Sequence, residues 1–230
     1  MNKKLDFNDL SREALNEMLE AVEQCILYRK EEHEQWADSR FPGCLGIPAA
    51  ILLFSIADAI GSYHRDRNKS FVVEIDGAPQ ALDNKAKHLY ILNYKFYGDQ
   101  RLSSKELDVL YKNYRSILTH NLGLPGSHIL ILDPTGNKLI EKKQGPQNDN
   151  WVLNLNVFFN LTKKAVEMFL SDSKEIIENS FAVKDEVAKK ETDLFGGIDT
   201  IDQLYNSTSS GDYVSPSGTN YTIPPNNSNH

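Results

Sequence analysis

The segment of residues 49–60, AAILLFSIADAI, constrains the fold most, because it is apolar on nearly every side. Pro48 precedes it and suits the first turn of a helix. A helix that lacks a polar face must be buried by other elements. We therefore expect this helix at the centre of a helical bundle, or shared with a dimer partner.

Asp58 is the charged residue of this apolar segment. A buried carboxylate is costly unless an ion pair or hydrogen bonds compensate for its lost hydration. Asp58 should therefore have a partner, and Arg115 is the candidate. In this interpretation the pair ties two helices together.

A second helix is predicted over residues 103–121, SSKELDVLYKNYRSILTHN. Ser103 and Glu106 have the spacing of a capping box, in which each side chain satisfies a free backbone N–H. Apolar residues then recur at helical spacing and predict one buried stripe. The stripe consists of Leu107, Leu110, Tyr111, Tyr114, Ile117 and Leu118.

Arg115 flanks this stripe, whereas Ser116 and His120 lie on the opposite side of an ideal helix. Arg115 and His120 are about 140° apart on such a helix, so one straight helix cannot aim both at one small target. Two solutions stay open. The helix deforms near Leu118, or a second copy supplies the missing partner, which predicts a two-fold dimer.

The stretch of residues 110–121, LYKNYRSILTHN, resembles the Arg-x(4 to 6)-His motif of HEPN domains. This resemblance implies an up-and-down helical bundle that dimerises through the motif helix. Many members are metal-independent endoribonucleases, often toxins held by a cognate antitoxin, and others are non-catalytic binding or scaffold modules. The nuclease members usually have Asn, Asp or His after the arginine, and Ser116 stands there instead.

The resemblance also implies roles for particular residues. The candidate catalytic residues are Arg115, His120, Ser116 and Asp58, and the candidate RNA contacts are Tyr111, Lys112, Asn113 and Asn121. Arginine offers fixed charge to phosphate, and histidine exchanges protons near neutral pH. Ser116 and Asn113 lie on the His120 side of the helix, where they would either orient its ring or contact phosphate. No metal or cofactor is needed, so such an enzyme leaves 2′,3′-cyclic phosphate ends. The rival hypothesis is a non-catalytic dimer that binds a nucleotide, RNA or protein partner.

The charge distribution places an RNA surface, if one exists, near the middle of the chain. The formal net charge is −7 overall, but residues 61–115 contain 10 Lys/Arg and 7 Asp/Glu. Phosphate contact requires local positive charge. A solvated mixed surface is the commoner origin of so small an excess. Tyrosines at 90, 94 and 97 beside lysines are candidates for base stacking, although aromatic residues at helical spacing more often form core.

The remaining elements complete a mainly α fold with about five helices. We expect a first helix from Asn8 to about Trp36, a third helix over residues 85–97, and a last helix capped by Asn156. In the third helix, the lysines and His88 should face water. Residues 71–76 alternate like a strand, and a short or extended connection fits them equally well. A small β meander near residues 127–156 follows the motif helix, with strands over 128–132, 139–143 and 151–156.

Two domains of different character are predicted. Residues 1–181 form the helical domain with its meander, whereas residues 182–230 are polar and acidic and should form a disordered tail. Cys25 and Cys44 make no disulfide framework or metal site. The amino terminus has no apolar signal region, and no membrane span is expected, so we expect a cytoplasmic protein.

Overall fold

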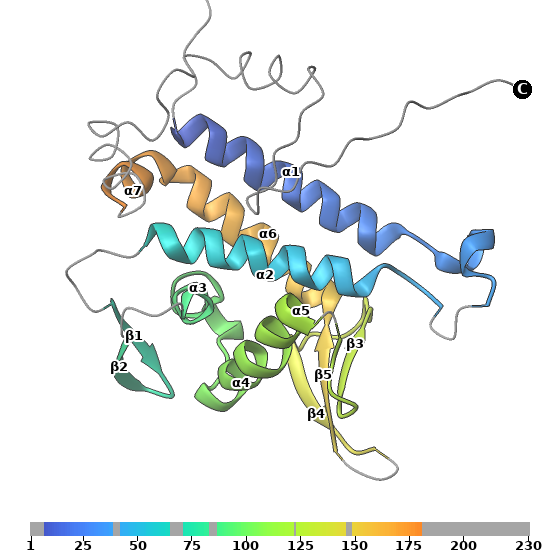
Figure 1. The fold of residues 1–230 in the computed structure, drawn as a ribbon. Coiled ribbons are helices and arrows are strands. Elements are labelled where there is room, and N and C mark those ends of the chain that lie inside the picture. The colour runs from blue at the N-terminus through green and yellow to red at the C-terminus, as the bar shows by residue number, and fades with distance from the viewer. Residues whose placement is uncertain are drawn as a thin grey trace, which may run out of the picture. The chain divides into compact units, whose positions relative to one another are not determined.

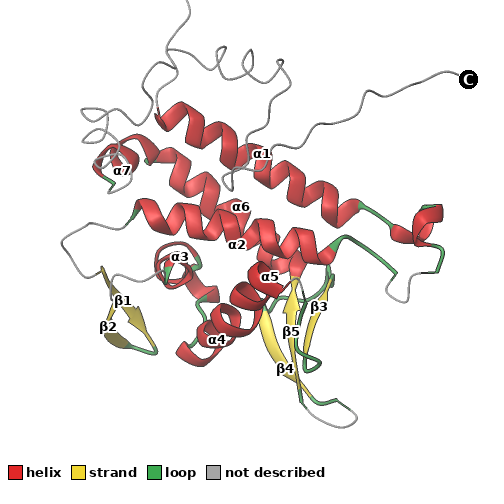
Figure 2. Cartoon of the chain, viewed as in Figure 1, coloured by secondary structure: helices red, strands yellow, loops and turns green. Residues whose placement is uncertain are grey.

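The computed structural model describes residues 7–38, 42–64, 71–82, 87–121, 123–145 and 149–180. All of them belong to one compact unit, Met1–Glu186. The described part is mostly helical with two small sheets (Figures 1 and 2), which confirms the mainly α class. The predicted disordered tail over residues 182–230 lies outside the described residues.

Helix α2 (Gly46–Tyr63) is the central element, as its apolar sequence predicted. Leu53, Ile56 and Ile60 are fully buried. Helices α1 (Phe7–Leu27), α3 (His88–Phe96) and α6 (Leu155–Ser171) all pack against α2 (Figure 1). Within the described residues α2 is also the one helix long and apolar enough to cross a membrane. In the structure, 44% of this apolar window is buried, and α1, α3 and α6 pack around it.

Helix α1 ends at Leu27, so the prediction that it continues to Trp36 was wrong. Two 3-10 turns follow, Lys30–Glu32 and Glu34–Trp36. The guanidinium of Arg29 folds back and donates to the carbonyl oxygens of the last turn, at 2.7 Å for Ile26. Those carbonyls have no amide partner at a helix end, and Arg29 satisfies them.

Residues before α3 form a hairpin of β1 (Phe71–Ile75) and β2 (Ala78–Leu82). The sequence left residues 71–76 open between a strand and an extended connection, and the structure has a strand there; the second strand was missed. The turn residues Asp76 and Gly77 have φ of 53° and 76°, values that Gly and Asp adopt in tight hairpin turns. The lone Asp-Gly dipeptide was the signal for this hairpin.

The three strands after the motif do not form a meander. The strand order is β3-β5-β4, with β5 (Asn150–Asn154) parallel to β3 (His128–Ile131) and antiparallel to β4 (Ile140–Lys143). The predicted hairpin between the first two strands was therefore wrong. Asn154 explains this order, because its amide bonds both backbone groups of Asp133 at the end of β3.

The same Asn154 begins α6. Its side chain accepts a hydrogen bond from the backbone N–H of Asn156 at 3.1 Å, so Asn154 is the cap and the prediction of Asn156 was wrong. A short helix α7 (Ser173–Asn179) follows and packs on α1 and α6.

Candidate functional site

The predicted motif helix consists of three segments. These are α4 (Ser104–Val109), a π-helical segment (Leu110–Arg115) and α5 (Ser116–Asn121). The capping box is confirmed at its start. Ser103 Oγ accepts from the Glu106 N–H, and the Glu106 carboxylate accepts from the Ser103 N–H at 2.9 Å.

The helix deforms earlier than the expected position near Leu118. The N–H and the hydroxyl of Ser116 both donate to the carbonyl oxygen of Tyr111, five residues back. This is the bond pattern of a π-helix, a feature often found at functional sites. Because α5 resumes α-helical geometry, Arg115 and His120 still lie about 140° apart. The deformation therefore does not bring them together.

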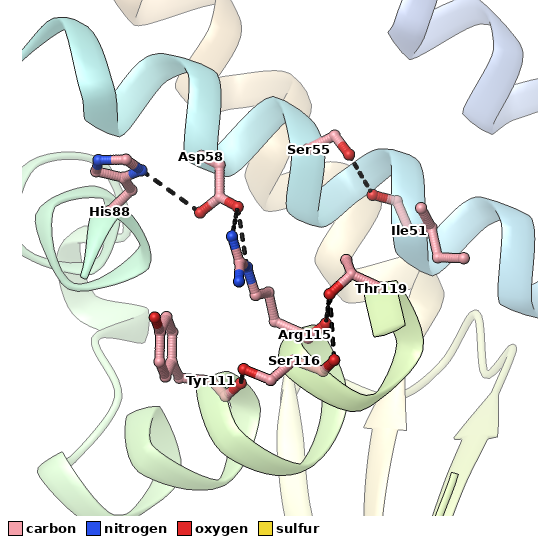
Figure 3. A network of polar contacts seen from close by, with 8 residues as sticks. All are labelled: Ile51, Ser55, Asp58, His88, Tyr111, Arg115, Ser116 and Thr119. Atoms are coloured by element: carbon pink, nitrogen blue, oxygen red, sulfur yellow. Dashed lines mark hydrogen bonds and ion pairs between the residues drawn. The ribbon is translucent and has the colours of Figure 1, made fainter. Parts of the chain in front are cut away.

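Asp58 joins Arg115 to a histidine that the sequence interpretation placed in water (Figure 3). Arg115 Nε and Nη2 donate to Asp58 Oδ2 at 3.0 and 2.7 Å. The other carboxylate oxygen, Oδ1, lies 3.6 Å from His88 Nδ1. The predicted Asp58–Arg115 pair is confirmed, and the side chains are 26% and 24% exposed.

His88 reaches Asp58 because α3 crosses α2 at a glycine. A Cβ built on Gly61 would lie 2.4 Å from His88 Cβ, so only glycine permits this approach. Gly61 lies three residues after Asp58, on the same side of α2. A glycine inside a helical pattern was the available signal for close packing.

The other predicted catalytic residues do not converge on this network. The hydroxyl of Ser116 is used by its own helix, as described above. His120 and Asn121 are exposed at the end of α5. Among the described residues, no hydrogen bond, ion pair or ring contact is recorded that joins His120 to Arg115 or Asp58.

Asn113 orients a different histidine from the expected one. Its Nδ2 lies 3.0 Å from Nε2 of His128, whose Nδ1 lies 3.1 Å from the Ser127 hydroxyl. Burial lowers the pKa of His128, which favours the neutral ring. Asn113 therefore connects the motif to β3, and its predicted contact with His120 does not form.

A pocket of about 550 Å³ brings together three of the four predicted RNA contacts, Tyr111, Lys112 and Asn113. We call it the lysine–tyrosine pocket. The fourth, Asn121, does not line it. The remaining lining residues are Gln80, Lys87, Tyr90, Ser104, Lys105, Asp108 and Val109. The sequence interpretation did not assign Lys105 or Gln80 to this site. Lys105 comes from α4, and Gln80 comes from strand β2, which was not predicted.

Positive charge dominates this pocket, whose lining contains three lysines and one aspartate. Asp108 accepts hydrogen bonds from Lys112 Nζ at 2.8 Å and from the Tyr90 hydroxyl. The hydrogen bond from Lys112 contributes most to lowering the pKa of Asp108, and the bond from Tyr90 lowers it further. The ammonium of Lys87 lies over the Tyr90 ring, 5.1 Å from its centre.

Tyr111 connects the pocket to the Arg115–Asp58 pair. It lines the pocket, and its ring centre lies 5.6 Å from the Arg115 guanidinium carbon. Figure 3 shows the ring of Tyr111 beside the Arg115 side chain. The ion-paired Arg115 therefore holds the ring of Tyr111 in its position beside the pocket.

Comparisons with known proteins do not assign this chain to a family. No protein-family model matches the sequence, and no characterised protein or solved structure gives a significant match. Within the described residues, no group of three or more His, Cys, Asp or Glu side chains could hold a metal ion.

Proposed function

We propose that this chain is a HEPN-like binding module with an up-and-down helical bundle, and that it holds single-stranded RNA in the lysine–tyrosine pocket. The observation that carries the proposal is the presence of three lysines and two tyrosines around one pocket of about 550 Å³. Ammonium groups neutralise phosphates, and tyrosine rings stack on unpaired bases. We place the module in the cytoplasm, as a homodimer.

A binding role agrees better with the Arg115 environment than catalysis does. Both hydrogen bonds from this guanidinium go to Asp58, so its charge is already compensated. A phosphate would have to displace a carboxylate that two donors hold. The arginine in this proposal keeps Tyr111 in place, and the phosphate contacts come from Lys105 and Lys112, both exposed.

Fluorescence anisotropy with a labelled single-stranded U12 RNA tests the proposal. We expect Lys112→Ala and Lys105→Ala each to weaken binding about 3-fold to 10-fold and to reduce its salt dependence. Tyr111→Ala should weaken binding by a similar factor through lost stacking. Lys163→Ala on the exposed side of α6 is the matched control and should bind like the wild type. Equal affinities for all four variants would refute the pocket as the RNA site.

The second candidate function is a metal-independent endoribonuclease of the toxin or defence type. It is favoured by the exposed position of His120, which leaves this ring accessible to a second copy. In such a dimer, His120 of one protomer would meet Arg115 of the other. An antitoxin protein would then be a natural partner.

RNA cleavage in excess chelator distinguishes the two functions. The nuclease requires 2′,3′-cyclic phosphate products from the wild type and none from His120→Ala or Arg115→Ala variants that remain dimeric by light scattering. Binding without cleavage, unchanged in His120→Ala, supports the binding module.

A further inference from the structure

The three-stranded sheet has two edges of opposite chemistry. The β4 edge has the sequence IEKK, and its charged side chains are of the kind that keeps an edge strand from pairing with other chains. The β3 edge has the sequence HILI, and Ile129 is 40% exposed. This edge therefore lacks the usual charged protection against strand addition.

A pocket of about 730 Å³ follows the β3 edge, and we call it the edge pocket. Five consecutive residues, from His128 to Leu132, line it. Because successive side chains of a strand point to opposite faces, a pocket that touches five in a row lies along the strand edge. Gly43 and Cys44 of the loop before α2 line it as well, together with Ile47 in the first turn of α2 and residues 124–126.

The strand register directs backbone groups into this pocket. Trp151 N–H donates to the Ser127 carbonyl at 2.8 Å, and His128 is the register partner of Trp151. In a parallel pair of this register, Ile129 and Ile131 direct their backbone groups toward β5. The N–H and C=O of Leu130 consequently point toward the open edge.

We propose that the edge pocket binds an extended apolar peptide of another protein, which adds a strand to the β3 edge. Leu130 offers one donor and one acceptor to the peptide backbone, and the apolar lining receives alternate side chains. Lys30 is the cationic side chain of the lining, and charge complementarity therefore selects a peptide with an acidic residue. The β3 strand of a second copy, HILI, has no acidic residue to meet Lys30, which favours a peptide of another protein over the sheet of a second copy.

Selection from a phage-displayed library of random linear dodecapeptides on the full chain tests this inference. We expect enriched peptides to alternate apolar residues and to carry Asp or Glu. A synthetic copy of an enriched peptide, methylated at alternate backbone nitrogens, should bind at least about 10-fold more weakly, because it cannot pair with a strand. Equal affinity of the methylated copy would overturn strand addition, and so would the absence of any enrichment over the bare support.

Two substitutions localise the binding. Ile129→Lys should abolish peptide binding, whereas Val72→Lys, at a 54% exposed position on the separate β1–β2 hairpin, should leave it unchanged. Gly126→Val is the second test, since a Cβ at Gly126 would meet no atom within 4 Å and should not disturb the fold. Peptide binding unchanged in both Ile129→Lys and Gly126→Val would overturn the assignment. Neither variant should change RNA binding at the lysine–tyrosine pocket.

Discussion

Arg115 and Asp58 form a two-donor ion pair in which both guanidinium bonds reach the same carboxylate oxygen, Oδ2. This leaves Oδ1 to face His88. A single aspartate thus connects α2, the end of the π-helical segment and the first residue of α3. Such a connection should matter more to stability than the exposed ion pairs of the surface.

We expect Asp58→Ala to lower the free energy of unfolding by about 2 kcal/mol, because it leaves Arg115 partly buried without its partner. A double-mutant cycle with Arg115→Ala should give a coupling energy of about 1–2 kcal/mol. The Asp108–Lys112 pair, with side chains 48% and 66% exposed, is the matched control and should couple by less than about 0.5 kcal/mol. Urea unfolding measures both cycles, and similar coupling in the two pairs would contradict the prediction.

Gly61→Ala should destabilise the fold by about 2 kcal/mol, although alanine is the better helix former. The added Cβ would lie 2.4 Å from His88 Cβ and must push α3 away from α2. Gly123→Ala is the control, because its Cβ would make an ordinary contact at 3.8 Å with the Asn121 carbonyl. Thermal unfolding of the two variants checks the difference, and an unchanged melting temperature for Gly61→Ala would show that the crossing is looser.

The stability of the protein should depend on His64 between pH 6.5 and pH 4. Burial, with the nearby charge of Lys95, lowers the pKa of this imidazole from 6.5 to about 4. Its ring lies against Phe96 and Phe169, with centroids 5.6 and 5.9 Å away. The folded state therefore holds the neutral ring, and the unfolded state binds the proton first as the pH falls.

The His64 contribution is complete above pH 6.5 and is lost as the pH falls toward 4, with a total of about 2–3 kcal/mol. His64→Leu should lose this dependence while the carboxylates titrate as before. Unfolding by urea at several pH values isolates the effect as the difference between the two proteins. Parallel curves for wild type and variant would assign the acid sensitivity to other groups.

Asp108→Asn should strengthen binding of single-stranded RNA about 3-fold to 10-fold. The substitution removes the negative charge of the lysine–tyrosine pocket and releases Lys112 from its ion pair, while an amide oxygen can still accept from Tyr90. Glu167→Gln on the exposed face of α6 changes the net charge equally and should leave the affinity unchanged. Anisotropy titrations at two salt concentrations compare them, and weaker binding by Asp108→Asn would mean that Asp108 itself contacts RNA.

Local signals in the sequence predicted much of this fold. The capping box at Ser103 depends on residues three apart, and the burial of α2 depends on its own composition. The π-helical segment escaped prediction, because Leu107, Leu110, Tyr114 and Leu118 keep an ordinary helical spacing through it. The two helix types differ in which carbonyl the backbone N–H groups reach, here that of Tyr111 from Ser116, and the side-chain pattern does not encode this.

The parts of the site that were missed depend on contacts between distant segments. His88 looked like a surface residue until the crossing at Gly61 placed it beside Asp58. The lysine–tyrosine pocket needs β2, α3 and the motif segments together, so Lys105 had no separate signal. The Asp58–Arg115 pair could be predicted because a lone carboxylate in an apolar helix requires a cation.

The central position of β5 also has a consequence for synthesis. Both ladders of the three-stranded sheet use β5, so β3 and β4 gain their strand partner only after Asn150–Asn154 has left the ribosome. The intervening residues take on the order of a second or more to translate. During that interval the HILI segment of β3 has no strand partner of its own sheet, and both of its edges are open to association with other chains.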